Sequence, residues 1–455
     1  MSIFIFSSHS SNCHGIKELL HILVEEKEAM LMKEIQERVM MAIERLWEEE
    51  VFFLQTLGRF PSTLGNEGAI QAYVADYFSN VLKLEVDKFV PEPKTLSEHP
   101  AYVPVEWSYT GRPVVVGTAR TKGKSVGKSL ILQSHVDVVS PEPMQEWDYH
   151  PWKATIVGDR MYGRGIQDMK AGMAAMIFAY RGIQEAGIRL GADVIFQSVI
   201  EEECTGNGAL AALERGHIAD GALIPEPFGL KAVTAQVGVI WLRIKVKGIG
   251  AHTERADQAV NPIEKAYVLL KALEQYEKHI NQQPKHPAFV HHPHPLNVNI
   301  GTLHSGDWPS SVPSECTLEV RIGFYPQIDP AKIQKEVKAW IMEACYQDEW
   351  LSHTKPELAF FGFKAKGAEI NKDEPLLQTL AKVHEHVHGT KLNTTSITAK
   401  TDIRTFLLEY GIPATCYGPV GEGMHGTNEW VDLKSVKDVT KTYAAFILEW
   451  CGVRS

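Results

Sequence analysis

The apolar run Asp193-Val-Ile-Phe-Gln-Ser-Val-Ile200 leads directly into three acidic residues, Glu201-Glu202-Glu203. Its length and its β-branched and aromatic residues predict a buried β-strand that ends at the glutamates. A second apolar run, Ser129-Leu-Ile-Leu-Gln133, predicts another buried strand, and the alanine-rich stretch 171–185 between the two runs predicts a helix. Strand, helix and strand in this order predict an α/β fold, with a mostly parallel sheet and helices on both faces.

The pattern of the chain changes near Val239. Residues 239–247 and 315–322 alternate apolar with polar side chains, which predicts strands that have one solvated face. Helices expected at 262–281 and 331–344 and a strand at 358–363 complete a smaller α+β unit. We therefore predict a catalytic domain at 31–239 and 369–455, an inserted α+β domain at 240–368, and an N-terminal extension at 1–30.

Composition limits the classes of protein to which this chain can belong. The chain has 455 residues, more than one ordinary core requires, and its net charge of -10 gives no support for nucleic acid or an anionic membrane as a partner. Six cysteines lack CxxC spacing, which argues against a disulfide framework or a thiolate zinc site. We find no signal peptide and no membrane-spanning run, and we expect a cytoplasmic protein.

Imidazoles and carboxylates recur where the predicted strands and loops meet. His135 and Asp137 follow a strand as Ser134-His-Val-Asp137, so the carboxylate can orient the imidazole as a metal ligand. Asp168 lies in a glycine-rich loop before the alanine-rich helix, where backbone can approach a metal closely. Taken alone, the first pair also fits an ordinary strand-end histidine, and Asp168 also fits a helix cap.

Three further segments add to this set. After the strand that ends at Ile200, neighbouring glutamates can take different roles, one as a metal ligand and the next as a general base. Glu226 is held in an extended segment by flanking prolines, and His425 lies in the glycine-rich loop 421–429. Each of the two also fits a plain loop position, but the whole set indicates two divalent metal ions and a hydrolytic reaction.

These motifs, in this order, resemble those of zinc-dependent deacylases and peptidases. That family includes acetylornithine deacetylase, succinyl-diaminopimelate desuccinylase, aminoacylase and glutamate carboxypeptidase. The resemblance runs from about Glu49 to the C-terminus and depends on the following segments: Ser-His-Val-Asp137, Gly-Arg-Gly-Ile-Gln-Asp-Met-Lys170, Glu-Glu-Glu-Cys-Thr-Gly-Asn-Gly208, Pro-Glu-Pro227, Gly-Ala-His252 and Gly-Met-His425.

The resemblance implies a role for each site residue. One metal ion would be held by His135, Asp168 and Glu226, and the other by Asp168, Glu203 and His425, with Asp168 bridging them. Glu202 would be the general base, Asp137 would support His135, and His252 would polarise the scissile carbonyl, often from the partner subunit. Substrate contacts would come from Arg321, Asp402 and Arg404. The ions would be zinc, with cobalt or manganese as alternatives.

The resemblance also implies the reaction and the assembly. The leading hypothesis is an amidohydrolase that removes the acyl group of an N-acylated amino acid or amine. Alternatives on the same dinuclear site are a di- or carboxypeptidase and an N-formyl aminopyrimidine deformylase, for which Arg321 would matter less. A metal-binding protein without catalysis is disfavoured because Glu202 is present. The inserted domain would serve as a lid and would form the interface of a homodimer. Ser310-Ser-Val-Pro313 departs from the family's Asn-Val-Ile-Pro.

Overall fold

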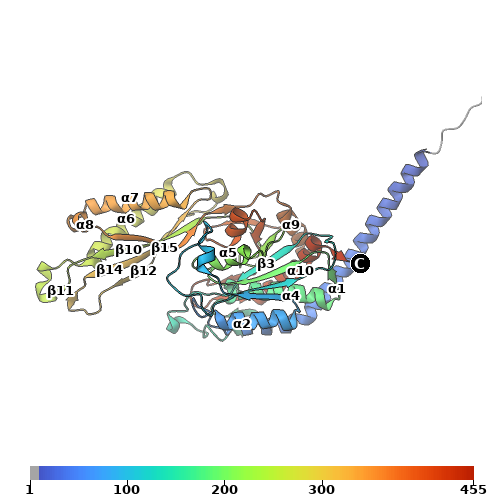
Figure 1. Cartoon of the computed structure of the whole chain (residues 1–455), viewed down its shortest axis with the longest axis horizontal. Helices are drawn as coiled ribbons and strands as arrows, with labels where there is room; N and C mark the ends of the chain where they lie inside the picture. The colour runs from blue at the N-terminus through green and yellow to red at the C-terminus, as the bar shows by residue number, and fades with distance from the viewer. Residues whose placement is uncertain (1–9, 455) are drawn as a thin grey trace, which may run out of the picture.

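The main body of the protein is built on a six-stranded sheet (Figure 1). The computed structural model describes residues 10–454. The sheet order is β1 (Glu85–Phe89), β2 (Val114–Ala119), β7 (Val194–Val199), β3 (Leu130–His135), β8 (Ala222–Ile224) and β18 (Ala414–Cys416). Strand β3 pairs in parallel with β7 and β8, and β8 pairs in parallel with β18, whereas β2 is antiparallel to both of its neighbours. The predicted mostly parallel sheet is confirmed.

Helices cover both faces of this sheet because its central strands are apolar on both sides. On one face, the ring of Phe196 contacts Tyr180 of α4 (Ala171–Glu185), and Ser198 Oγ donates to Gln71 Oε1 of α2 (Gly68–Asp76) at 2.7 Å. On the other face, Gln197 Nε2 donates to His217 O, just after α5 (Asn207–Glu214). Helices α1 (Ser10–Gly58) and α10 (Leu433–Cys451) pack against α4, and α9 (Pro375–His388) packs against α10.

A second, smaller body carries a four-stranded antiparallel sheet (Figure 1). Its order is β12 (Val298–Ser305), β14 (Glu315–Phe324), β10 (Gly238–Lys247) and β15 (Glu357–Ala365). Ile244 and Leu318 face a separate core under α6 (Pro262–Gln282) and α7 (Pro330–Tyr346), and the alternate residues form an open face. This confirms the expected inserted α+β unit. Its limits at 240 and 368, and the extension at 1–30, stay predictions. Helix α1 runs from Ser10 to Gly58 without a break at residue 30, and residues 1–9 lie outside the described residues.

Shorter elements lie beside the two sheets. Beside the main sheet lie β4 (Thr155–Val157), β5 (Arg160–Tyr162), β20 (Trp430–Asp432) and β19 (Gly421–Glu422), together with β16 (Ala368–Glu369), β9 (Ala232–Gln236) and β17 (Thr394–Ile397), and the pair β6 (Arg189–Leu190) and β21 (Val453–Arg454). The small body adds β11 (Ala251–His252), β13 (Ser311–Val312) and α8 (Glu349–His353), and α3 (Pro93–Leu96) precedes β2.

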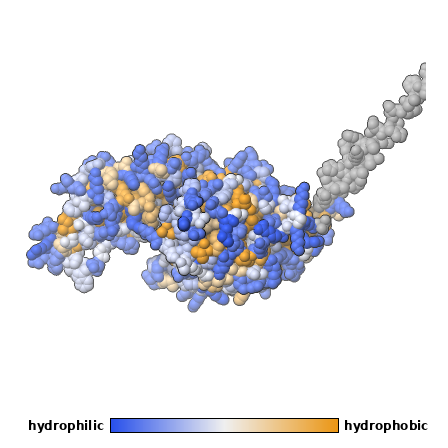
Figure 2. Space-filling view, viewed as in Figure 1, coloured by the Kyte–Doolittle hydropathy of each residue, from blue (hydrophilic) through white to orange (hydrophobic). Residues whose placement is uncertain are grey.

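Figure 2 shows hydrophobic side chains in separate patches on both bodies, with hydrophilic surface between them. Among residues 10–454, no helix combines the length and apolar character of a membrane span.

A buried carboxylic acid lies between α1 and α10. Glu50 is fully buried; its Oε1 accepts a hydrogen bond from Thr440 Oγ1 at 2.6 Å, and its Oε2 has no partner among the described residues. Burial raises the pKa of Glu50 from 4.5 to about 8. The folded protein therefore keeps a proton that the unfolded chain releases between these pH values, so stability falls as the pH rises through that window.

We expect Glu50→Gln to be more stable than the parent protein at pH 8. The amide stays neutral, so the variant avoids a penalty of roughly 1 kcal/mol for each pH unit within the window. Thermal unfolding at pH 5 and pH 8 checks this, with Glu48→Gln, an exposed position of the same helix, as the control. A difference in Tm between Glu50→Gln and the parent that is the same at both pH values would contradict the assignment.

Candidate metal centre

The predicted site residues meet at the carboxyl edge of the main sheet. His135 is the last residue of β3, Glu202 and Glu203 follow β7, and Glu226 follows β8. Because these three strands are parallel neighbours, their carboxyl ends lie at one edge, where ligands of α/β sheets collect. Asp168 approaches from the turn before α4.

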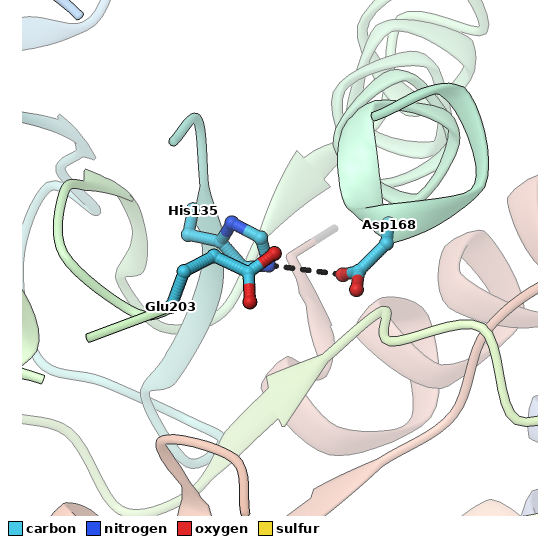
Figure 3. Close-up of side chains that lie close together, drawn as sticks. All are labelled: His135, Asp168 and Glu203. Carbon is cyan, nitrogen blue, oxygen red and sulfur yellow. Dashed lines mark hydrogen bonds and ion pairs between the residues drawn. The ribbon is translucent and has the colours of Figure 1, made fainter. Parts of the chain in front are cut away.

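Asp168 lies between two histidines, one on each of its oxygens. Its Oδ1 is 3.2 Å from His135 Nε2, and Figure 3 shows these two side chains with Glu203 beside them. Its Oδ2 is 3.3 Å from His425 Nε2, which is also 3.1 Å from the Glu203 carboxylate. Glu226 Oε1 is 3.8 Å from His135 Nε2, the same imidazole nitrogen that faces Asp168. This is the arrangement that two ions sharing Asp168 would require.

The donor set fits divalent cations. Ligand atoms of His135, Asp168 and Glu203 lie within 4.8 Å of one another, and so do those of His135, Glu202 and Glu226. Burial, and then Asp168, raise the pKa of Glu226 well above its usual range. Several carboxylates are thus concentrated around the buried imidazole of His135 and the half-exposed imidazole of His425, and divalent cations would supply the missing positive charge.

The carboxylates also act on the histidines. Burial alone would lower the pKa of His425, but Glu203 and Asp168 outweigh it and raise that pKa to about 11. Burial would likewise raise the pKa of Asp168, but hydrogen bonds from His135 and His425 hold it well below its usual range. Without metal the imidazoles would therefore carry protons, and ions that bind here would displace them.

Asp137 differs from the expectation in how it acts. His135 Nδ1 donates to the backbone oxygen of Asp137 at 2.9 Å, while the Asp137 carboxylate is 3.7 Å away. That hydrogen bond leaves Nε2 as the free ligand atom. The Asp137 carboxylate instead accepts from the backbone N–H groups of Glu202 at 3.3 Å and Glu203 at 3.0 Å. Asp137 thus fixes both the imidazole and the segment that carries the two glutamates.

Glu202 faces a lysine that the sequence did not single out. Lys400 is buried, and its Nζ donates to Glu202 Oε1 at 2.7 Å and to the backbone oxygen of Glu202 at 2.5 Å. Burial raises the pKa of Glu202 to about 6, against the opposing charge of Lys400. A pKa near neutrality suits a group that takes and returns a proton. The local sequence Ala399-Lys-Thr401 gives no sign of this contact, which comes from folding.

Glu429 is a second residue that sequence reasoning missed. It is buried, and its Oε1 accepts from the backbone N–H groups of Gln167 at 2.9 Å and Asp168 at 3.1 Å. Its Oε2 accepts from Gly165 N at 3.0 Å and from Arg164 Nη1. These bonds hold the turn that presents Asp168. The only sequence signal was its position at the end of the loop that contains His425.

The remaining predicted residues do not all lie beside this cluster. His252 is exposed on β11, at the end of the small body remote from the main sheet (Figure 1). Arg321 lines a cavity next to the cluster, and its Nη2 donates to Thr398 O at 2.8 Å. Asp402 and Arg404 are both buried. Asp402 accepts from Gln133 Nε2, and Arg404 donates to Thr205 O.

The chain is similar to proteins of a known family. Residues 131–449 match the family model "Peptidase family M20/M25/M40". An N-formyl-4-amino-5-aminomethyl-2-methylpyrimidine deformylase of Halalkalibacterium halodurans is 30% identical over 76% of this chain and 84% of its own length. A deformylase of the same name from Bacillus subtilis is 27% identical over 86% of this chain and 91% of its own length.

The fold is also shared with solved structures. Human carnosine dipeptidase 1 superposes with a TM-score of 0.72 at 16% identity, covering 91% of this chain and 99% of that one. The predicted resemblance is confirmed. The chain belongs to peptidase family M20/M25/M40 and is a dinuclear metal hydrolase that acts on amide bonds.

Proposed function

We propose that this enzyme hydrolyses the formamide of an N-formyl aminomethylpyrimidine and releases formate and the free amine. The observation that carries the proposal is the 30% identity, over 84% of its length, to a relative named for this deformylation. These relatives favour the deformylase alternative over the leading hypothesis of an N-acyl amino acid deacylase. An aromatic cavity next to the metal cluster, lined by Trp241, Phe361 and Phe363, also supports a ring-bearing substrate.

The chain's own residues divide the chemistry between them. His135, Asp168 and Glu226 would hold one ion, and Asp168, Glu203 and His425 the other. Ions bound there would polarise the formyl carbonyl and make water more acidic. Glu202 takes the proton of the attacking water and returns it to the departing amine as the carbon–nitrogen bond breaks. Lys400 holds the Glu202 carboxylate in place through its contact with Oε1.

We also propose the identity of the ion, a homodimeric assembly and a reducing compartment. Imidazole with carboxylate ligands favours zinc, with cobalt or manganese as alternatives. A homodimer joined through the small body would allow His252 of a second copy to reach the scissile carbonyl, since its own His252 lies far from the cluster. Five free, buried cysteines among the described residues suit a reducing compartment such as the cytoplasm.

A second candidate is a deacylase of N-acyl amino acids. Arg321 is largely buried beside the cavity and has no carboxylate partner among residues 10–454, so it can bind a substrate carboxylate. A side-by-side assay separates the two candidates. We expect the metal-loaded enzyme to hydrolyse the formyl pyrimidine with a kcat/KM at least about 10-fold above that for acetylornithine, succinyl-diaminopimelate or dipeptides.

The opposite order of rates would favour the second candidate. If the protein binds metal but hydrolyses none of a broad panel of acyl amines, neither candidate is correct. That result would indicate a metal-binding protein without catalysis.

A further inference from the structure

A cavity of about 340 Å³ lies between the metal cluster and the open face of the small sheet. On one side it is lined by Glu202, Glu203 and His425. Its other side is formed by the ends of β10, β12, β14 and β15 nearest to the main body. The residues of these strands are therefore the ones that a substrate meets when its amide lies at the cluster.

Four of these residues form one row across the sheet. Strand register places Asn299 opposite Arg321, Arg321 opposite Trp241, and Trp241 opposite Phe361. Residues directly opposite one another on adjacent strands share a face and lie about 5 Å apart. All four line the cavity. The row thus places an amide, a guanidinium and two aromatic rings side by side.

The aromatic end of the row is set by a bulge. The register of β15 against β10 shifts between Ile240 and Trp241, and this brings Phe363 as well as Phe361 against the Trp241 ring, with centroids 4.9 and 5.6 Å away. Gly362 makes the bulge possible, because its φ is +53° and a Cβ there would lie 2.4 Å from the Trp241 ring. The three rings line the cavity with aromatic side chains, which suit a planar ring.

Asn299, an uncharged side chain, lies at the polar end of the row, opposite Arg321. The next row holds Glu319, whose carboxylate is paired with Arg243 Nε at 2.9 Å and accepts from Thr302 Oγ1, so it is already satisfied. Asn299 is exposed, and its side-chain amide makes no hydrogen bond to any residue in 10–454. A side-chain amide pairs in bidentate fashion with an amino group next to a ring nitrogen, as asparagine does with adenine.

We propose that this row is the binding site for the substrate's heterocycle, with Asn299 as the residue that recognises its 4-amino group and the adjacent ring nitrogen. Trp241 and Phe361 would pack against the ring and orient its aminomethyl arm toward Glu202. This inference rests on the proposed deformylation and adds to it which side chains select the amine part of the substrate.

The test pairs a substrate change with a side-chain change. The kcat/KM of the metal-loaded parent, Asn299→Ala and His304→Ala is measured with N-formyl-4-amino-5-aminomethyl-2-methylpyrimidine and with its analogue that carries hydrogen in place of the 4-amino group. His304 lies on the same strand, exposed and outside the cavity, and is the matched control. We expect the parent and His304→Ala to prefer the amino substrate by about 10-fold or more.

Asn299→Ala should lose that preference, with little change for the analogue that lacks the amino group. An Asn299→Ala enzyme that keeps the preference, or that loses activity equally on both compounds, would overturn the inference. If the parent hydrolyses neither compound, the proposed function fails, and calorimetry with the free amine 4-amino-5-aminomethyl-2-methylpyrimidine and its 4-hydrogen analogue decides the inference instead. Selective binding that Asn299→Ala abolishes would uphold it, and unselective or undetectable binding would overturn it.

Discussion

Glu202→Gln should lower kcat/KM for amide hydrolysis by at least about 10³-fold while leaving the metal content of the protein unchanged. Glutamine keeps the size of the side chain and an oxygen for Lys400, but it cannot accept the proton of the attacking water. Glu202 is absent from both ligand sets that share Asp168, so the ions should stay. Steady-state kinetics together with elemental analysis of the purified variant measures both quantities.

The control for this change is Glu422→Gln, an exposed carboxylate on β19 next to the loop of His425. It should match the parent in rate and in metal content. Loss of an ion from Glu202→Gln would mean that the roles of Glu202 and Glu203 have been assigned the wrong way round.

The second large effect is expected at Asp168. Asp168→Asn should weaken metal binding by at least about 10²-fold and reduce activity in proportion, because this carboxylate contacts both His135 and His425. The amide nitrogen cannot bind a cation, and the site loses the one negative charge that both ions would share. Isothermal titration of chelator-treated protein with zinc gives the affinity of each site.

Asp159→Asn serves as the matched control, since Asp159 is an exposed loop residue between β4 and β5. Two zinc ions bound to Asp168→Asn with the affinity of the parent would contradict a bridging role for Asp168.

Much of the fold could be predicted because the elements concerned carry strong local patterns. Helix α4 begins and ends at the predicted residues, 171 and 185, since its alanine-rich stretch is bounded by a glycine-rich loop and a turn. Strand β10 was predicted from its alternation, which reports directly that one face packs on α6 and α7 while the other is open. Patterns of period two or 3.6 are local properties, so sequence alone exposes them.

The contacts around Glu202 show what local patterns cannot give. Glu201, Glu202 and Glu203 are identical side chains, yet Glu201 is buried against Arg112 and accepts from Trp107. The different environment of Glu201 depends on contacts with segments about 90 residues earlier in the chain. Lys400 reaches Glu202 from a segment 198 residues later. A residue whose partner is this distant has no signal in its own neighbourhood.

The substrate side of the site was the least predictable part for the same reason. Asn299, Trp241 and Phe361 are unremarkable in their own strands, and only the register of four strands aligns them. Register depends on pairing between segments that are far apart in the chain. The metal ligands could be found because their chemistry is unusual, whereas a pocket wall is built from ordinary residues.

We propose that this chain cleaves amides with two divalent ions held by side chains at one edge of its main sheet. The most direct measurement strips the protein with a chelator and follows both bound zinc and hydrolysis of the formyl pyrimidine as zinc is returned. We expect no activity in the stripped protein and full activity when two ions are bound per chain. Full activity without metal, or binding of only one zinc ion per chain at saturating zinc, would contradict a dinuclear mechanism.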